Sequence, residues 1–288
     1  MGVNTNYKDS VFSFLFSDPD TLRELYGAIA GLELPPDLPV TINTLEGVLY
    51  RNLLNDISFE IGKKLVVILE HQSTVNPNLP LRVLMYIARV YEKLTAGRNV
   101  YGRKKLLIPR PEFIVLYNGK EPYAEKVELR LSEAFEAAGV LGRGGEIPLE
   151  LALTVYNINR GHNGEMVERC EKLRGYSEFI GKVRELEGER GDREAAMEGA
   201  VRWCIGEGIL RDFFEEHGTE VVNMLMAEWK LEDALVVERE EGREEGWEER
   251  GERDREDTIR NLLDFGMKAE QISRALKLPL DTIERYLK

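Results

Sequence analysis

Residues 56–72 read DISFEIGKKLVVILEHQ, and this stretch decides the fold. Its first six residues alternate between polar and apolar side chains, which predicts a half-buried β-strand. The unbroken apolar run Leu65–Leu69 predicts a second strand that is covered on both faces of a sheet. Gly62 and the lysines that follow it supply the turn between the two strands. The stretch therefore predicts an antiparallel hairpin over Asp56–Ile61 and Lys64–Gln72.

The flanking segments extend this hairpin into an α/β pattern. The N-terminal segment has helical spacing, with a helix at Thr21–Ile29 that Asp18 caps. A further strand is expected at Ile42–Leu49, before the hairpin. After the hairpin come a helix at Leu79–Leu94 and a strand at Glu112–Tyr117. The expected fold class is α/β, with helices around a small mixed sheet.

The second half of the chain has a different character. Helical patterns dominate residues 150–235, whereas residues 238–257 hold 11 acidic and 5 basic residues and almost nothing apolar. The last segment, residues 258–288, has the pattern of two short helices joined by a tight turn, which is typical of a helix-turn-helix or of a plain helical hairpin. We expect a core at 1–150, a helical extension at 151–237, a charged linker at 238–257 and a helix-turn-helix-like unit at 258–288.

Charge and composition limit the classes of function. The net charge is −13, but residues 1–150 carry 17 basic and 19 acidic residues, so the acidity lies mainly in the second half. A basic cluster without any acid lies between Glu92 and Glu112, and it is either a solvated loop or a patch that contacts phosphates. Its members are Arg98, Arg103, Lys104, Lys105 and Arg110. DNA is therefore not excluded as a partner.

No apolar run approaches the ~20 residues that span a bilayer, and the N-terminus lacks the pattern of a secretory signal. Cys170 and Cys204 are interpreted as small buried hydrophobes rather than a disulfide. A cytoplasmic protein without a membrane partner is expected.

The number of residues in the hairpin turn decides whether the hairpin can form a metal site. If the turn has three residues, Asp56 lies opposite Glu70, and directly opposed Cβ atoms are about 4.5–5.5 Å apart. Two carboxylates at that spacing suit Mg²⁺, which prefers oxygen ligands. A turn of two residues would put the two acids on opposite faces of the sheet and spoil the site.

Several motifs carry a resemblance to a known family. The central motif is DISFEIGKKLVVILEHQSTVN with the LPLRVLMYI that follows it. Others are YKDSVFSFLF near the N-terminus, LTVYNINRGHN, LRGYSEFIGKVREL, NMLMAEWKLEDAL, the repeated EGREEG and the terminal NLLDFGMKAEQI. Together they resemble the bacterial recombination-promoting nuclease (Rpn) family over nearly the whole chain. Members of that family belong to the PD-(D/E)XK nuclease superfamily, which implies a restriction-endonuclease-like core.

The resemblance implies a DNA endonuclease that depends on Mg²⁺ or Mn²⁺ and is linked to recombination or mobile elements. Asp56 and Glu70 match its two metal-binding acids. Gln72 stands where the wider superfamily usually has a catalytic lysine, as it does in this family. A neutral amide can orient water only by hydrogen bonds, so the metal must supply more of the charge. Asp9 matches the position of a further acid, although an Asp at the start of a helix is more often a cap.

The DNA-binding residues are assigned from their positions in the chain and from the charge distribution. Arg82 can reach a scissile phosphate or form a structural ion pair, and with Arg98, Arg103, Lys104 and Lys105 it completes the expected DNA-binding set. No transposase triad of acidic residues is evident in the sequence. The alternatives are a non-catalytic DNA-binding protein on a degenerate nuclease fold and a helical scaffold or antitoxin-like partner in which residues 150–288 dominate. A second copy of the chain, in a homo-oligomer, is a further candidate partner.

Overall fold

The computed structural model describes residues 10–43, 56–71, 77–136, 147–227 and 229–230, and then residues 258–263, 266–276, 278–280 and 283. At positions 56, 69–71, 190 and 274–275 the description covers the backbone. The chain divides into two compact units, Met1–Glu228 and Trp229–Lys288. Each unit has a hydrophobic cluster of its own.

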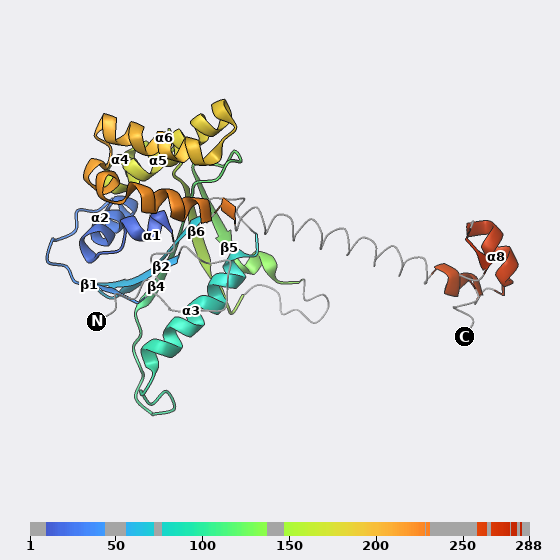
Figure 1. Ribbon diagram of the computed structural model, residues 1–288. Helices are drawn as coiled ribbons and strands as arrows, with labels where there is room; N and C mark the ends of the chain where they lie inside the picture. The colour runs from blue at the N-terminus through green and yellow to red at the C-terminus, as the bar shows by residue number, and fades with distance from the viewer. Residues whose placement is uncertain are drawn as a thin grey trace. The chain divides into compact units, whose positions relative to one another are not determined.

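One mixed sheet with the strand order β1-β2-β3-β4-β6-β5 organises the first unit (Figure 1). The strands are β1 (Val40–Ile42), β2 (Asp56–Ile61), β3 (Lys64–His71), β4 (Arg110–Tyr117), β5 (Lys126–Arg130) and β6 (Ala152–Asn157). The pairs β1–β2, β2–β3 and β5–β6 are antiparallel. Strands β3, β4 and β6 run parallel, and helix α3 (Leu79–Thr95) makes the crossover from β3 to β4.

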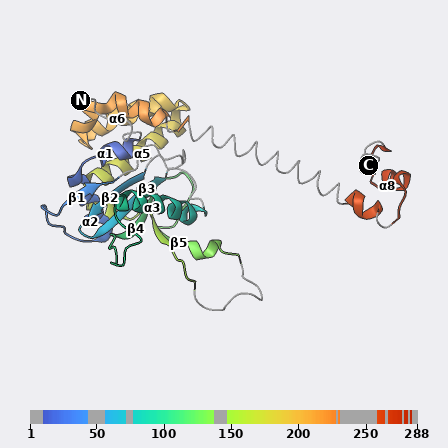
Figure 2. The ribbon, with the colours of Figure 1, turned by 90° about the horizontal axis from the view of Figure 1, so that it is seen from below.

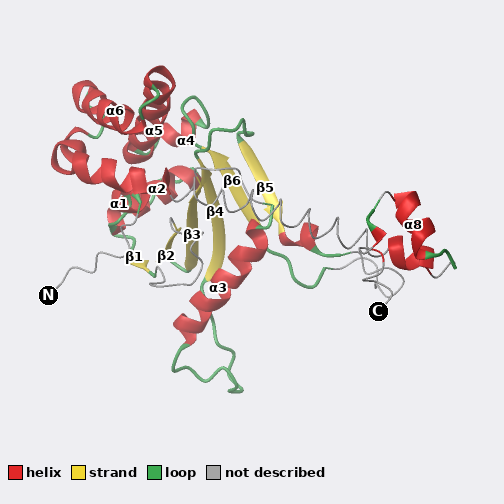
Figure 3. Ribbon diagram, turned by 45° about the vertical axis from the view of Figure 1, so that its right-hand side comes forward, coloured by secondary structure: helices red, strands yellow, loops and turns green. Residues whose placement is uncertain are grey.

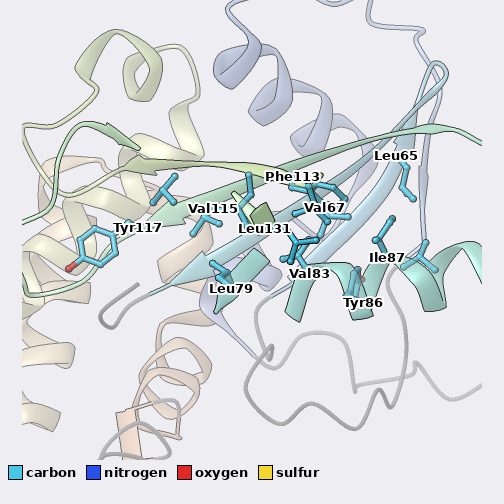
Figure 4. Packing of buried hydrophobic residues seen from close by; sticks show 14 residues of the cluster. Leu65, Val67, Leu79, Val83, Tyr86, Ile87, Phe113, Val115, Tyr117 and Leu131 are labelled. Carbon is cyan, nitrogen blue, oxygen red and sulfur yellow. The ribbon is translucent and has the colours of Figure 1, made fainter. Parts of the chain in front are cut away.

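Helix α3 covers one face of this sheet (Figure 4). Val83 and Tyr86 of the helix pack in one buried cluster with Val67 of β3 and Val115 of β4. Each fully buried side chain of this kind stabilises the fold by about 1.5–3 kcal/mol. The Tyr86 hydroxyl donates a hydrogen bond of 3.0 Å to Ser58 Oγ, which satisfies two polar groups beneath the helix. Ser58 therefore marks the α3 face of β2.

A layer of helices lies on the other side of the sheet (Figures 2 and 3). Its members are α1 (Val11–Leu15), α2 (Pro19–Ala30), α5 (Glu171–Arg190) and α6 (Arg193–Glu207). The rings of Phe12 in α1 and Tyr176 in α5 are 5.7 Å apart, and those of Tyr26 in α2 and Phe59 in β2 are 6.4 Å apart. Phe59 therefore marks the second face of the sheet.

Most of the elements expected around the hairpin are present. The hairpin itself, the helix after it and the strand after that helix are β2, β3, α3 and β4. Asp18 caps α2 as predicted, because its Oδ1 accepts hydrogen bonds from the backbone nitrogens of Asp20 and Thr21 at 3.0 and 3.1 Å. Of the strand expected at Ile42–Leu49, residues 44–49 lie outside the described residues.

The sheet extends further along the chain than expected. Strand β6 lies between β4 and β5, and α4 (Gly164–Glu168), α5, α6 and helical residues 211–227 follow it within the first unit. The expected boundary at residue 150 therefore falls just before a strand of the same sheet. Both β5 and β6 were absent from the predicted elements, because each is short and carries several polar side chains.

The two cysteines behave as buried apolar groups. Cys170 and Cys204 are free thiols without exposed surface. Burial raises the pKa of both thiols to about 12, so neither forms an appreciable thiolate at neutral pH. The interpretation of both residues as buried hydrophobes is confirmed. Among the helices that the structure describes, none has the length and apolar character needed to cross a membrane.

The second unit contains a small helical hairpin. Residues 258–263 are helical, Gly266 turns the chain with a φ of 82°, and α8 (Ala269–Leu276) follows. Ile259, Ile272 and Ile283 have no exposed surface and form the centre of its core. This is the predicted pattern of two short helices joined by a tight turn. The charged segment 238–257 lies outside the described residues.

Candidate active site

The turn between β2 and β3 has two residues, Gly62 and Lys63. Gly62 has a φ of 60°, and glycine adopts this conformation without the steric cost that a Cβ atom would bring. Two-residue turns that begin with such a glycine match the twist of antiparallel strands. The turn pairs Ile61 with Lys64 and thereby fixes the register of the whole hairpin.

This register places Asp56 opposite Leu69, one position short of Glu70. Directly paired residues share a face, and successive residues alternate between faces. Position 56 therefore belongs to the α3 face, in the row that contains Ser58. Position 70 belongs to the opposite row, which contains Lys64.

The expected direct opposition of Asp56 and Glu70 is therefore wrong. It depended on a three-residue turn, and the chain instead closes the hairpin with Gly62 and Lys63. A change of one residue in the turn moves every side chain of one strand to the other face relative to its partner. Regular pairing up to the end of β2 does not place the two acids on one face.

The two acids nevertheless lie at one edge of the sheet. Strand β2 begins at Asp56, and β3 ends one residue after Glu70. Strand β4 ends at the same edge, where Leu116 pairs with Glu70 and Tyr117 pairs with His71. We use the term acid edge for this end of the strands, which is formed by the start of β2 and the ends of β3 and β4. His71 alternates with Glu70 along β3, so position 71 lies in the row of the α3 face.

The described residues expected to bind Mg²⁺ are not brought together by the strand pairing. Asp56 and Glu70 offer the carboxylate oxygens that this ion prefers, but the register separates their rows. Gln72 and Asp9 lie outside the described residues. Ser10 is the N-cap of α1, and its hydroxyl oxygen accepts a hydrogen bond of 3.0 Å from the Ser13 nitrogen. No group of three or more His, Cys, Asp or Glu side chains suited to a metal occurs among the described residues.

A polar network that the sequence did not reveal lies beside the acid edge. Asn118 directly follows β4 and is 1% exposed. Its Oδ1 accepts a hydrogen bond of 3.4 Å from Arg184 of α5, and Arg184 also donates to the Asn118 carbonyl and, at 2.6 Å, to Asn159 Oδ1. Within the described part of the chain, the buried Asn118 Nδ2 has no hydrogen-bond acceptor. Such an orphan donor costs about 1–3 kcal/mol.

A close packing arrangement holds the turn after Asn118. A Cβ atom on Gly119 would lie 2.4 Å from the ring of Tyr117. Tyr117 is fully buried, and its hydroxyl donates a hydrogen bond of 2.8 Å to the Glu121 carbonyl. Burial, above all, raises the pKa of this hydroxyl, which keeps it a neutral donor. Asn118 and Gly119 were not among the predicted site residues, and their place directly after the strand expected at Glu112–Tyr117 was the signal in the sequence that could have identified them.

The predicted DNA-binding residues do not form one cluster. Arg82 is half-buried in the first turns of α3, near the acid edge, and its backbone nitrogen donates to the Asn78 carbonyl at 3.2 Å. The other four lie in the loop that joins α3 to β4, and this loop projects beyond the far end of α3 (Figure 3). That end of the sheet is fixed by the pairing of Arg110 with Lys64. The loop residues are Arg98, Arg103, Lys104 and Lys105, all exposed.

The other two histidines serve local contacts. His162 Nδ1 lies 2.7 Å from Glu125 Oε1, and the ring of His217 packs 4.7 Å from that of Phe14.

Comparison with known proteins found no matching family model, no similar curated protein and no similar solved structure.

Proposed function

We propose that this chain is a metal-dependent DNA endonuclease of the PD-(D/E)XK superfamily and a member of the Rpn family. One observation carries the proposal. The stretch that resembles the family motif occupies a central hairpin, and its acids, Asp56 and Glu70, both lie at the acid edge, where β2 starts and β3 and β4 end. In open α/β sheets, sites gather at the carboxyl ends of parallel strands. The order of hairpin, helix and parallel strand is compatible with such a core.

The proposal assigns Asp56, Glu70 and Gln72 to the chemistry, with Mg²⁺ as the cofactor and Asp9 as a further acid. A bound Mg²⁺ would lower the pKa of a water molecule and offset charge that develops on the phosphate. The Gln72 amide would orient water or phosphate oxygens by hydrogen bonds. The structure pairs the start of β2 regularly, with Asp56 opposite Leu69. Both acids can therefore hold one ion only if metal binding changes this pairing, for example to a β-bulge, a feature common beside active sites.

The register also gives weight to the second candidate function, a non-catalytic DNA-binding protein. If Asp56 keeps its place opposite Leu69, the carboxylates do not converge, and an amide at position 72 cannot supply the missing charge. The chain would then retain the nuclease fold for recognition. Both candidate functions require DNA binding, and only the first includes DNA cleavage.

A plasmid assay separates the two candidates. Supercoiled plasmid is incubated with the full chain in Mg²⁺, in Mn²⁺ and in EDTA, alongside Asp56→Ala and Glu70→Ala. Glu60→Ala is the matched control, because Glu60 is an acid on β2 whose carboxylate accepts a hydrogen bond of 2.8 Å from Asn43, away from the acid edge. We expect cleavage by wild type and Glu60→Ala in metal only, and none by the two edge variants.

Folding of each variant is checked by thermal unfolding followed by circular dichroism. Cleavage at the wild-type rate by folded Asp56→Ala or Glu70→Ala would remove that residue from the site. DNA binding by wild type without cleavage in either metal would support the non-catalytic candidate instead.

A further inference from the structure

The loop between α3 and β4 has the composition of a nucleic-acid contact. We define the basic arm as residues 96–110. It contains five cations and no acid, in a chain whose net charge is −13. All five cations are exposed, and none of them forms an ion pair with another residue that the structure describes. They are Arg98, Arg103, Lys104, Lys105 and Arg110.

The hairpin turn adds a sixth cation to the same end of the sheet. The Arg110 nitrogen donates a hydrogen bond of 3.0 Å to the Lys63 carbonyl, so the arm begins its return to the sheet beside the Gly62-Lys63 turn. Lys63 is exposed. The cations are thus held by backbone pairing around one end of β3.

Tyr101 is presented at the tip of the arm. Its side chain is 97% exposed, which is unusual for a large aromatic group. Two hydrogen bonds that Asn99 accepts define the turn that carries Tyr101. The Asn99 side chain accepts from the Tyr101 nitrogen at 3.1 Å, and the Asn99 carbonyl accepts from the Gly102 nitrogen at 3.2 Å. Val100 and Leu107 of the same arm are 56% and 78% exposed. The ring is therefore held out into solvent by a defined turn.

A row of cations on α3 connects the arm with the acid edge. Arg82, Arg89 and Lys93 are seven and four residues apart, which puts them on one side of the helix. With its 17 residues α3 is about 25 Å long. This equals the rise of roughly seven base pairs of duplex. A linear row of positive charge fits the backbone of a nucleic acid better than the plane of a membrane surface.

We propose that the basic arm binds DNA that contains unpaired bases, with Tyr101 stacking on one base and the cations of the arm contacting the flanking phosphates. Base-aromatic stacking needs an unstacked base, which an intact duplex does not offer. The substrate class is therefore DNA with a single-stranded segment, such as a flap, bubble or branch, about seven base pairs from the acid edge. This inference rests on the proposed function for its choice of DNA, but the binding step requires neither metal nor cleavage.

Binding by the full chain is measured in EDTA, by fluorescence anisotropy with a labelled oligonucleotide that carries a single-stranded flap and with the matching intact duplex. Tyr101→Ala should weaken binding to the flap by about 5- to 150-fold and to the duplex by less than twofold. Phe135→Ala is the control, because Phe135 is a 49% exposed aromatic residue outside the arm, and it should change neither value.

The cations are tested through the salt dependence of binding. The variant Arg103→Ala/Lys104→Ala/Lys105→Ala should reduce the slope of log K against log salt by about 2 for single-stranded DNA. Arg202→Ala, an exposed cation on α6, should leave the slope unchanged.

Equal loss of flap and duplex binding in Tyr101→Ala would overturn the stacking role. Binding to vesicles of phosphatidylcholine and phosphatidylserine that depends on Tyr101 and exceeds binding to the flap would assign the arm to a membrane surface instead. Failure of cleavage with intact, Tyr101-dependent binding would refute the nuclease and leave this inference standing.

Discussion

Lys64 Nζ lies 2.7 Å from Glu112 Oε2 and also 2.7 Å from the Tyr26 hydroxyl, so this cation ties α2 to β3 and β4. The Tyr26 hydroxyl in turn donates a hydrogen bond of 2.8 Å to Glu112 Oε2. Tyr26 is 3% exposed, whereas the side chains of Lys64 and Glu112 are 44% and 37% exposed. Burial, above all, raises the pKa of Tyr26, so its hydroxyl remains a proton donor at neutral pH.

The exposed and buried parts of this contact should differ in their effect on stability. Lys64→Met should lower the free energy of unfolding by less than about 1 kcal/mol, because exposed ion pairs are screened by water. Glu112→Ala should cost about 1–3 kcal/mol, because it leaves the buried Tyr26 hydroxyl without its acceptor. Urea denaturation of the two variants measures both values. Equal losses would show that Tyr26 finds another acceptor.

The cap of α2 offers a prediction with a defined pH dependence. Burial alone would raise the pKa of Asp18, but hydrogen bonds from Thr21 and Asp20, together with the charge of Lys172, bring it below its usual 3.8. Because the pKa is lower in the folded state, the stabilisation is present above the unfolded pKa and is lost as the pH falls through the folded pKa. Asp18→Ala should cost about 1 kcal/mol at pH 7.

Asp18→Asn is the matched variant, since an amide oxygen still accepts hydrogen bonds but carries no charge. Thermal unfolding of wild type and both variants is compared between pH 7 and pH 3. The advantage of wild type over Asp18→Asn should shrink once the pH falls below about 3.8. An advantage that grows with acidity would contradict the assigned role of the carboxylate.

The hairpin shows which features of the fold can be predicted from the sequence and which cannot. Alternation in DISFEI and the apolar run after it suffice for two strands, because both patterns follow from burial of one or two faces. The register could not be obtained in the same way. Gly62, Lys63 and Lys64 permit turns of two or three residues, and the choice depends on how the strands pair with their neighbours. The positions of Asp56 and Glu70 relative to each other therefore required the structure.

Elements at the side of the sheet were harder to predict. β5, with the sequence KVELR, has only two apolar residues and lies at the sheet edge. Its placement depends on pairing with β6 across a long separation in sequence. The contact of Arg184 with Asn118 joins residues 66 positions apart, and no local pattern indicates such a partner. The basic arm, in contrast, was visible as a run of cations without acids.

Gly119 and Gly188 make a matched pair of substitutions. A Cβ on Gly119 would lie 2.4 Å from the buried Tyr117 ring, whereas a Cβ on Gly188 in α5 would meet nothing within 4 Å. Gly119→Ala should therefore destabilise the fold by about 1–3 kcal/mol. Gly188→Ala should stabilise it by up to about 1 kcal/mol, because alanine favours the helix. Chemical denaturation measures both, and a neutral Gly119→Ala would mean that Tyr117 moves aside freely.

The second unit should be separable from the chemistry of the first. Ile259, Ile272 and Ile283 form a core within this unit, and the sheet with its acid edge belongs to the other unit. The acidic segment 238–257 precedes the hairpin in the sequence. A chain that ends before Arg255 should therefore fold and retain any cleavage at high DNA concentration.

The same truncation identifies what the C-terminal unit contributes. Arg285, Tyr286 and Lys288 are basic or aromatic, but the sequence of the segment has no dense cluster of basic residues, so we expect assembly to be its main role. Light scattering should show a smaller particle for the truncated chain than for the full chain, corrected for the lost residues, while affinity for flap DNA in EDTA changes little. Reduced affinity at unchanged subunit number would assign the unit to DNA binding instead, since phosphate contacts contribute directly to affinity. Complete loss of cleavage in a truncated chain that is folded, with an active full chain, would contradict the division into two independent units.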